Sequence, residues 1–376
     1  MSDQRSPRVL FSGAGTGGHL YPGIAVAQEI RRRYPRSLVV FAGTGRDLEV
    51  RVLGELGFDF YRVHSAGLKG KSPRALVRGV SVLPVSAWDA WRVITRVAPQ
   101  VVVGLGGYSS GAVVLLASLR RIPTMVLEQN AMPGITNRLL VPFITEAAVS
   151  HGLVLPHFRG KAFVSGNPVR IGFFEPPMTV TARSTTAQLL VLGGSQGAHA
   201  INVAMMAAAP LLAASSEQIS VTHQTGERDH DAVRRAYAEA GLPARVEPFL
   251  EQMADAMRDA DVVVCRAGAT TLAEIAAVGR PALLVPLPEA ADGHQRLNAE
   301  VFGRAGAAET VQQVEMTGAL LAERLLRLMG DGERRRRMAV AARALAKPDA
   351  VRVIVDRVEQ LMGGDRYERI DGSDRA

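Results

Sequence analysis

Short runs of consecutive apolar residues alternate along this chain with longer segments whose apolar residues recur at helical spacing. Continuous apolar runs are typical of parallel strands that are buried on both faces. Their alternation with helical segments such as residues 25–34 and 270–278 predicts an α/β fold with doubly wound parallel sheets. The runs that we expect to form strands are residues 9–11, 38–41, 101–103, 124–127, 189–192, 262–264 and 282–285.

A glycine-rich loop follows an apolar run in each half of the chain, first at residues 13–19 and again at residues 193–197. Each loop leads into a helical segment, so the second loop predicts the start of a second Rossmann-like domain. Ligands of such sheets bind beyond the carboxyl ends of the strands, and we therefore expect the site in a cleft between two domains. The expected boundaries are 1–168 for the first domain, 169–347 for the second, 348–363 for a C-terminal helix that returns to the first domain, and 364–376 for a frayed tail.

The composition is that of a globular protein, with 47% hydrophobic and 21% charged residues. The net charge of +8 favours polyanions or anionic lipid headgroups as partners, although an arginine-rich proteome explains it equally well. No zinc-finger spacing or RNA-recognition signature is present, so nucleic acid is not expected. Cys265 is the single cysteine, and no apolar signal segment precedes the first strand, which together predict a cytoplasmic location.

The first glycine loop, residues 13–19, ends in Gly17-Gly18-His19 and opens a helix. Glycines let the backbone approach a ligand closely, and the helix N-terminus presents N–H groups and a partial positive charge to a phosphate. Imidazole groups ordinarily titrate near neutral pH, so His19 is a candidate general base, or else a structural cap. A further glycine loop at residues 104–111 could complete a nest of N–H groups for a diphosphate, or could only permit tight turns.

Two common nucleotide sites are disfavoured by the residues. A dinucleotide-binding domain needs an acidic residue at the end of its second strand, but that strand ends here in residues 41–45 (Phe-Ala-Gly-Thr-Gly). A phosphate loop ending in Lys-Ser or Lys-Thr is absent, and so are paired cysteines and a His-Glu-x-x-His motif. We therefore expect neither NAD nor a metal.

In the second half, residues 265–274 follow an apolar run and open a helix whose N–H groups suit a phosphate. Glu274 lies just inside that helix, where its carboxylate can accept hydrogen bonds from two ribose hydroxyls or simply complement the helix dipole. The polar cluster of residues 292–298 suits the recognition of sugar hydroxyls, or is an ordinary solvated loop.

Together these motifs resemble the MurG family of bacterial glycosyltransferases. The motifs occur in the family's order: residues 13–19 (Gly-Ala-Gly-Thr-Gly-Gly-His), 106–111 (Gly-Gly-Tyr-Ser-Ser-Gly), 128–130 (Glu-Gln-Asn), 166–170 (Gly-Asn-Pro-Val-Arg), 193–198 (Gly-Gly-Ser-Gln-Gly-Ala) with Asn202, 265–274, and 294–299 (His-Gln-Arg-Leu-Asn-Ala). The resemblance implies a GT-B fold of two Rossmann-like domains. It also implies an inverting, metal-independent transfer of N-acetylglucosamine from UDP-N-acetylglucosamine to the 4-hydroxyl of N-acetylmuramic acid in lipid I, which forms lipid II for peptidoglycan, with no cofactor.

The resemblance also assigns roles to individual residues. His19 is expected to be the general base, with Glu128 as its orienter, an alternative base or an acceptor ligand. Gln295 would read the sugar hydroxyls, and the role of His294 stays open because some members have glutamine there. The remaining donor ligands would be Thr16, Gly17, Gly18, Asn130, Arg170, Ser195, the backbone of Leu250 at the uracil, the amides of Ala269, Thr270, Thr271 and Leu272 at the diphosphate, and Glu274 at the ribose. The acceptor ligands would be Gly15, Gly104, Gly106, Gly107 and Tyr108.

Residues 68–93 combine bulky apolar side chains, including Trp88 and Trp91, with flanking cations such as Lys69 and Arg92. This pattern suits peripheral attachment to an anionic membrane surface, or an ordinary amphipathic helix with a basic face. A lipid acceptor favours the first alternative and places the protein at the cytoplasmic face of the cell membrane, with other cell-wall synthesis proteins as candidate partners. Three other functions stay open: a related glycosyltransferase with another lipid acceptor, a UDP-N-acetylglucosamine 2-epimerase, and a module that only binds the nucleotide sugar.

Overall fold

The computed structural model describes residues 6–13, 15–65, 73–175, 186–194, 197–288, 290 and 293–363, without the side chains of residues 73–81. The chain divides into two compact units. Unit 1 comprises Met1–Arg170 together with Lys347–Ala376, and unit 2 comprises Ile171–Ala346. This division lies two residues beyond the boundary expected between residues 168 and 169.

Unit 1 is built on a seven-stranded sheet in the order β3-β2-β1-β4-β5-β6-β7, and every neighbouring pair is parallel. The strands are β1 (Arg8–Ser12), β2 (Leu38–Gly43), β3 (Asp59–Arg62), β4 (Val101–Gly104), β5 (Thr124–Glu128), β6 (Glu146–Val149) and β7 (Ala162–Val164). The helices are α1 (Gly17–Arg33), α2 (Asp47–Glu55), α3 (Pro73–Val97), α4 (Tyr108–Leu119), α5 (Ile135–Leu140) and α13 (Ala350–Met362), with a 3-10 helix, η1 (Gly152–Phe158).

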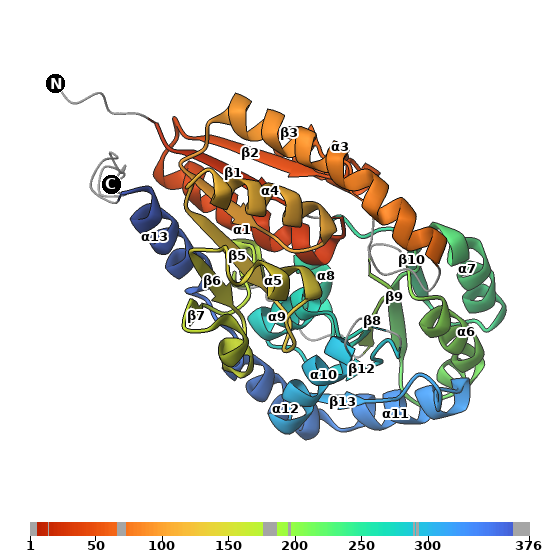
Figure 1. Cartoon of the computed structure of the whole chain (residues 1–376). Coiled ribbons are helices and arrows are strands. Elements are labelled where there is room, and N and C mark those ends of the chain that lie inside the picture. Colours follow the sequence, from red (N-terminus) through yellow and green to blue (C-terminus); the bar gives the residue numbers. More distant parts are fainter. Residues whose placement is uncertain are drawn as a thin grey trace. The chain divides into compact units, whose positions relative to one another are not determined.

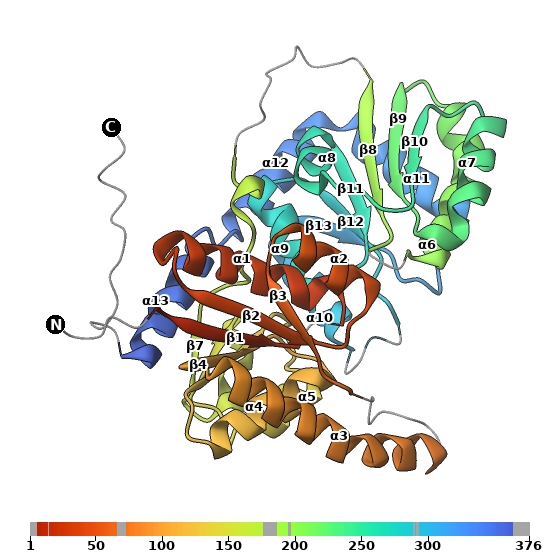
Figure 2. The same ribbon diagram turned by 90° about the horizontal axis from the view of Figure 1, so that it is seen from above.

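Helices cover both faces of this sheet, which is why its strands are apolar throughout. Val9 and Phe11 of β1 pack with α1 and α13 in one core cluster, whereas Leu10 packs with α3 and α4 in another. Figure 2 shows α1 on one side of the strands and α3, α4 and α5 on the other. The strand order reverses between β1 and β4, so the loops that follow these two strands lie at the switch point where doubly wound sheets bind ligands.

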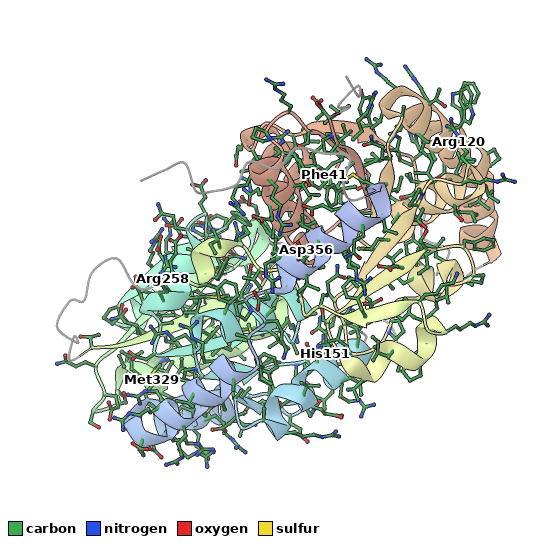
Figure 3. All side chains as sticks on the ribbon, turned by 90° about the vertical axis from the view of Figure 1, so that its left-hand side faces the viewer. Phe41, Arg120, His151, Arg258, Met329 and Asp356 are labelled. Atoms are coloured by element: carbon green, nitrogen blue, oxygen red, sulfur yellow. The ribbon has the colours of Figure 1, made fainter. Side chains whose placement is uncertain are left out.

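The C-terminal helix α13 belongs to unit 1, where it packs along α1. The Arg33 guanidinium at the end of α1 lies 2.5 Å from a carboxylate oxygen of Asp356 and 2.9 Å from one of Glu359. Asp356 marks the position of α13 in Figure 3. These ion pairs join the C-terminal helix to the end of α1 within one unit.

Unit 2 contains a six-stranded parallel sheet in the order β10-β9-β8-β11-β12-β13, all labelled in Figure 2 and all except β11 in Figure 1. Its core joins the strands to α6, α7 and α11, and Gly318 of α11 approaches α6 so closely that a Cβ there would lie 2.5 Å from the Cβ of Ala207. The strands are β8 (Ala187–Leu192), β9 (Ile219–Gln224), β10 (Ala244–Glu247), β11 (Val262–Cys265), β12 (Ala282–Leu284) and β13 (Ala308–Thr310). The helices are α6 (His199–Ala213), α7 (His230–Glu239), α8 (Met253–Asp259), α9 (Ala269–Val278), α10 (His294–Arg304), α11 (Gly318–Gly330) and α12 (Gly332–Ala344), with 3-10 helices η2 (Ile171–Phe173) and η3 (Glu227–Asp229).

The predicted fold class is confirmed. Each apolar run named in the sequence lies within or overlaps a strand, and both sheets are parallel and doubly wound. Within the part of the chain that the structure describes, no helix is long and apolar enough to cross a bilayer.

Candidate active site

The loop that follows β1 is held by a buried carboxylate from α2. Glu49, which is 1% exposed, accepts hydrogen bonds from the Gly15 N–H (2.7 Å), the Arg46 N–H (2.9 Å) and the Thr44 hydroxyl (2.8 Å). The Arg46 guanidinium in turn donates to the Gly15 carbonyl at 2.7 Å. Both backbone groups of Gly15 are therefore engaged inside unit 1, so its predicted use as an N–H donor to the acceptor is not supported.

His19 lies in the first turn of α1, and its Nδ1 is 3.2 Å from the hydroxyl of Thr16, the residue that precedes the helix. The other edge of its ring lies against the loop that follows β4. Gly106 has a φ of +99°, and a Cβ on it would lie 2.9 Å from His19 Cδ2. Glycine is required at this position both by the backbone conformation and by the histidine ring. The two glycine loops of unit 1 thus meet at His19.

The residues predicted to bind the acceptor divide into two groups. Gly104 is the last residue of β4, and a Cβ there would lie 2.8 Å from a methyl group of Val114, so this glycine serves helix–sheet packing and its assignment as a ligand is not supported. Gly107 precedes α4 with a φ of +76°, and Tyr108 opens the helix with 36% of its surface exposed. The start of α4 therefore places Gly107 and Tyr108 where a ligand can reach them.

Glu128 ends β5 with a side chain that is 3% exposed. One carboxylate oxygen accepts from the Asn130 N–H (3.1 Å) and side-chain amide (3.3 Å), and the other from the Gly134 N–H and the Asn137 amide (both 2.9 Å). Burial raises the pKa of Glu128, and these hydrogen bonds oppose the rise. Four donors fill the acceptor sites of a carboxylate, so Glu128 anchors the Asn130 loop. This geometry argues against the predicted roles as base, orienter of His19 or acceptor ligand.

Several predicted donor ligands lie in unit 1. Thr16, Gly17 and Gly18 form the start of α1, where Gly17 is buried against Tyr21. The guanidinium of Arg170 lies 4.5 Å from the centre of the same tyrosine ring, in a cation–π contact. Asn130 is tied to Glu128 as described above.

In unit 2, the loop after β8 contains Ser195, which lies outside the described residues. Gly193 and Gly197 of this loop pack tightly against the end of β9, where a Cβ would lie 3.0 Å from the Gln224 carbonyl oxygen for Gly193 and would overlap the Thr225 carbonyl oxygen for Gly197. Leu250 follows β10 and is 4% exposed, and its N–H donates to the side-chain oxygen of Gln224 at 3.0 Å. The carbonyl group is therefore the backbone group of Leu250 that fits the predicted uracil contact.

Helix α9 begins directly after the small residues that follow β11. Its first residue is Ala269, and the Leu272 N–H donates to the Gly268 carbonyl at 3.0 Å, the first hydrogen bond of the helix. The N–H groups of residues 269–271 precede that bond and suit an anion. Leu272 does not fit the predicted diphosphate contact, because its N–H is part of the helix. Glu274 lies one turn further along and is 8% exposed.

Two side chains of α10 hold the loops beside α9. The Gln295 carbonyl oxygen accepts the Leu287 N–H at 3.0 Å, which leaves the Gln295 amino group as a donor for a sugar hydroxyl. The buried Asn298 amide donates to the Ala267 carbonyl at 3.1 Å. Among the residues that the structure describes, no cluster of three or more His, Cys, Asp or Glu side chains could hold a metal ion.

Of the loop-holding residues, Glu49 and Gln224 do not stand out in the sequence, and Asn298 does so only as part of a motif, without this role. All three are buried polar side chains. The sequence signal for Gln224 is its position as a polar residue at the end of a strand, directly before Thr225-Gly226.

Two parallel α/β units with glycine loops at their switch points form a GT-B fold, the architecture of a large class of glycosyltransferases. Residues 9–149 match the model of the glycosyltransferase family 28 N-terminal domain, and residues 188–354 match that of its C-terminal domain. The chain belongs to this family, and within it to the MurG enzymes, as comparison with individual relatives shows.

One such relative is the UDP-N-acetylglucosamine--N-acetylmuramyl-(pentapeptide) pyrophosphoryl-undecaprenol N-acetylglucosamine transferase of Anaeromyxobacter sp. (strain Fw109-5). It is 44% identical over 356 residues, which cover 94% of this chain and 93% of that protein. The crystal structure of Acinetobacter baumannii MurG superposes with a TM-score of 0.73 at 30% identity, covering 94% of this chain and 99% of that one. A UDP-N-acetylglucosamine 2-epimerase has a TM-score of 0.70 but 12% identity, which shows a shared fold alone.

Proposed function

We propose that this enzyme transfers N-acetylglucosamine from UDP-N-acetylglucosamine to the 4-hydroxyl of N-acetylmuramic acid in lipid I, with inversion at the anomeric carbon, and so makes lipid II for peptidoglycan. The observation that carries the proposal is 44% identity over 94% of the chain to a transferase whose name states this donor and acceptor. The loops at the switch points of both sheets support it, because each places polar groups beyond the strand ends.

Unit 2 takes the donor in this proposal. The N–H groups of residues 269–271 receive the diphosphate at the N-terminus of α9, with Ser195 as a further ligand. Glu274 accepts from the ribose hydroxyls, and the Leu250 carbonyl accepts from the uracil. The Gln295 amino group reads the sugar hydroxyls. UDP leaves with a developing negative charge, which fixed N–H donors at a helix start stabilise.

Unit 1 supplies the chemistry at the acceptor. A sugar hydroxyl is a poor nucleophile at neutral pH, and a positioned general base contributes about 10²–10⁴-fold to such a step. His19 is the proposed base: the Thr16 hydroxyl lies beside Nδ1, and Nε2 lies on the ring edge that faces Gly106. One direct displacement inverts the anomeric carbon without a covalent intermediate. Gly106, Gly107 and Tyr108 are the proposed acceptor contacts, whereas Thr16, Gly17, Gly18, Asn130 and Arg170 are proposed to contact the donor.

The proposal includes peripheral attachment of unit 1 to the anionic cytoplasmic face of the cell membrane, where other cell-wall synthesis proteins act. Trp88 and Trp91 of α3 are 62% and 45% exposed and stack with ring centroids 5.3 Å apart. Beside them, a cavity of about 210 Å³ is lined by Tyr61, Arg62, Asp89, Arg92, Val93 and Arg96. Exposed indoles and neighbouring guanidinium groups favour a membrane interface with anionic headgroups. Lys69 and the side chains of residues 73–81 lie outside the described residues.

The reaction is tested by mass spectrometry of the products from labelled UDP-N-acetylglucosamine, with and without a short-chain lipid I analogue. Labelled lipid II analogue formed only when the acceptor is present supports the proposal. Conversion of the nucleotide sugar without acceptor would identify an epimerase instead, and labelled diacylglycerol in a parallel reaction would identify another acceptor. Binding without any turnover would leave a nucleotide-sugar-binding module.

The membrane contact is tested separately by sedimentation with vesicles of anionic and of zwitterionic lipid at low salt. We expect binding to the anionic vesicles alone, and weaker binding for Trp88→Ala/Trp91→Ala. Absence of the wild type from the anionic pellet would refute the membrane contact without affecting the reaction.

A further inference from the structure

Gln224, the last residue of β9, lies between two segments of the proposed donor site. Its strand is flanked by β8 on one side and β10 on the other, and Gln224 is opposite Leu192 and Glu247. Strand β8 continues into the glycine loop, and β10 continues into the segment that ends at Leu250. The side chain is 2% exposed.

The Gln224 amide makes one hydrogen bond to each of these segments. Its amino group donates to the Gly194 carbonyl at 2.7 Å, and its carbonyl oxygen accepts the Leu250 N–H at 3.0 Å. Gly194 offers an acceptor and Leu250 a donor, so the amino group of the Gln224 amide must face Gly194 and its oxygen must face Leu250. A primary amide has an N–H donor and a carbonyl acceptor, as a peptide group does. The Gln224 side chain therefore extends the hydrogen bonding between β8, β9 and β10 by one further step beyond the strand ends.

The backbone around Gln224 is fixed independently of this side chain. The Gln224 carbonyl accepts the Gly193 N–H at 3.0 Å, and the Thr225 N–H donates to the Glu247 carbonyl at 3.0 Å. The preceding His223 is buried, with Nδ1 2.7 Å from the Tyr237 hydroxyl and Nε2 3.1 Å from the Asn202 side-chain oxygen. These hydrogen bonds hold the backbone from which the Gln224 side chain extends. A side chain on a fixed backbone can in turn fix the positions of the two loop segments that it binds.

We propose that Gln224 is a positioning residue for the donor: it fixes the segment ending at Leu250, which binds the uracil, relative to the glycine loop after β8, which supplies a further ligand of the diphosphate, so that both ends of UDP are bound together. The inference rests on the proposed donor site in unit 2. Binding of the two ends of one ligand is cooperative only when the protein holds their subsites at the matching separation. Without the Gln224 amide, the uracil subsite and the diphosphate subsite each keep their own contacts with UDP. Their separation is then less well fixed, so the second phosphate adds less to the affinity.

The test measures dissociation constants of UDP and UMP by isothermal titration calorimetry for the wild type and for Gln224→Met, which keeps the length of the side chain without its polar atoms. The ratio of the UMP constant to the UDP constant reports what the second phosphate contributes. We expect this ratio to fall about tenfold in Gln224→Met, and the KM for UDP-N-acetylglucosamine to rise by a similar factor, while kcat at saturating donor changes little.

Gln188→Met is the matched control. Gln188 lies near the start of the neighbouring strand β8, where its amide donates to the Thr186 carbonyl at 3.2 Å, so the same substitution removes an amide–backbone bond at the amino ends of the strands, opposite to Gln224. The ratio for Gln188→Met is expected to equal that of the wild type. An unchanged ratio in folded Gln224→Met would overturn the inference. A wild type that binds neither nucleotide would instead overturn the donor site, and the inference with it.

Gln224→Glu provides a second variant whose effect is reversible by pH. A protonated carboxyl group can donate to the Gly194 carbonyl and accept from the Leu250 N–H, as the amide does, whereas a carboxylate has no donor for Gly194. We expect the ratio, normalised to the wild type at each pH, to recover as the pH falls from about 8 to about 5.5. A loss of affinity that is the same at every pH would show a merely structural effect and overturn the inference.

Discussion

In unit 1 the loops that follow β1 and β5 are held by buried carboxylates, whereas in unit 2 the loops that follow β8 and β11 are held by side-chain amides. Glu49 accepts the Gly15 N–H, and Glu128 accepts the Gly134 N–H. In unit 2, Gln224 donates to the Gly194 carbonyl and Asn298 to the Ala267 carbonyl. The two sheets share one topology, but the side chains that hold their loops bind different backbone groups. In unit 1 they bind N–H groups, and in unit 2 they bind carbonyl groups.

This difference decides which loops can receive an anion. A carboxylate accepts hydrogen bonds from N–H groups of the loop and adds negative charge, and both effects disfavour an anion. An amide that donates to a carbonyl binds an acceptor of the loop, so the neighbouring N–H groups can bind a phosphate. Unit 2 therefore suits the diphosphate of the donor. One loop of unit 1 follows the same pattern, since the Gln129 amide donates to the Leu105 carbonyl at 3.3 Å. We expect the acceptor's pyrophosphate near Gly106–Tyr108 and not at Gly15.

The largest effect is expected from His19→Ala, which tests the assignment of the chemistry to unit 1. Turnover should fall about 10²–10⁴-fold, because the acceptor hydroxyl loses its base. The dissociation constant for UDP-N-acetylglucosamine should stay within a few-fold, because the diphosphate, ribose and uracil contacts are assigned to unit 2 and the proposed donor contacts of unit 1 are not mutated. Single-turnover rates and calorimetry on the same preparation measure the two quantities. Unchanged turnover would remove His19 from the chemistry and leave it as a partner of Thr16 and a packing neighbour of Gly106.

Glu274→Ala should produce the reverse result, with weaker donor binding and little change in kcat at saturation. Hydrogen bonds to a charged group contribute about 1.5–3 kcal/mol, so the loss of affinity for UDP should be about 10- to 100-fold. The mutation should also abolish the preference of the enzyme for UDP over 2′-deoxy-UDP. A variant that still discriminates between these ligands would show that Glu274 only complements the dipole of α9, and Glu274→Gln controls for the charge.

The sequence predicted the strands and the order of the loops well, because continuous apolar runs and glycines after a strand are local signals. It could not predict which N–H groups of a loop are already engaged. Gly15 and Glu49 are 34 residues apart, and nothing near either one indicates their contact. The predicted diphosphate contact of the Leu272 N–H does not fit, because in a helix that begins at Ala269 this group already donates to the Gly268 carbonyl. Gly104 belonged to a glycine motif, yet its lack of a side chain serves the packing of Val114.

The smallest effect is expected from replacing a loop-holding carboxylate of unit 1 by an amide, and a loop-holding amide of unit 2 by a carboxyl group. Glu128→Gln places an amino group against N–H donors and should lower the free energy of unfolding by about 1–3 kcal/mol. Burial raises the pKa of Glu128 in the folded protein above the ordinary glutamate value of 4.5. The wild-type side chain therefore contributes most below pH 4.5, and its contribution is lost as the pH rises through the higher folded pKa. The stability difference between Glu128→Gln and the wild type should shrink accordingly as the pH rises.

Asn298→Asp is the matched exchange in unit 2 and should show the opposite trend with pH. It places a carboxyl group beside the Ala267 carbonyl, in a site where Asn298 is 1% exposed, so the charged form is disfavoured and the variant loses stability as the pH rises. Urea unfolding of both variants and the wild type between about pH 4.5 and 8 measures the two slopes. A Glu128→Gln difference that widens with pH would mean that its four hydrogen-bond donors outweigh burial. The loops of unit 1 would then be anchored by a stabilised anion, which would repel the acceptor's pyrophosphate from residues 128–134 as well as from Gly15.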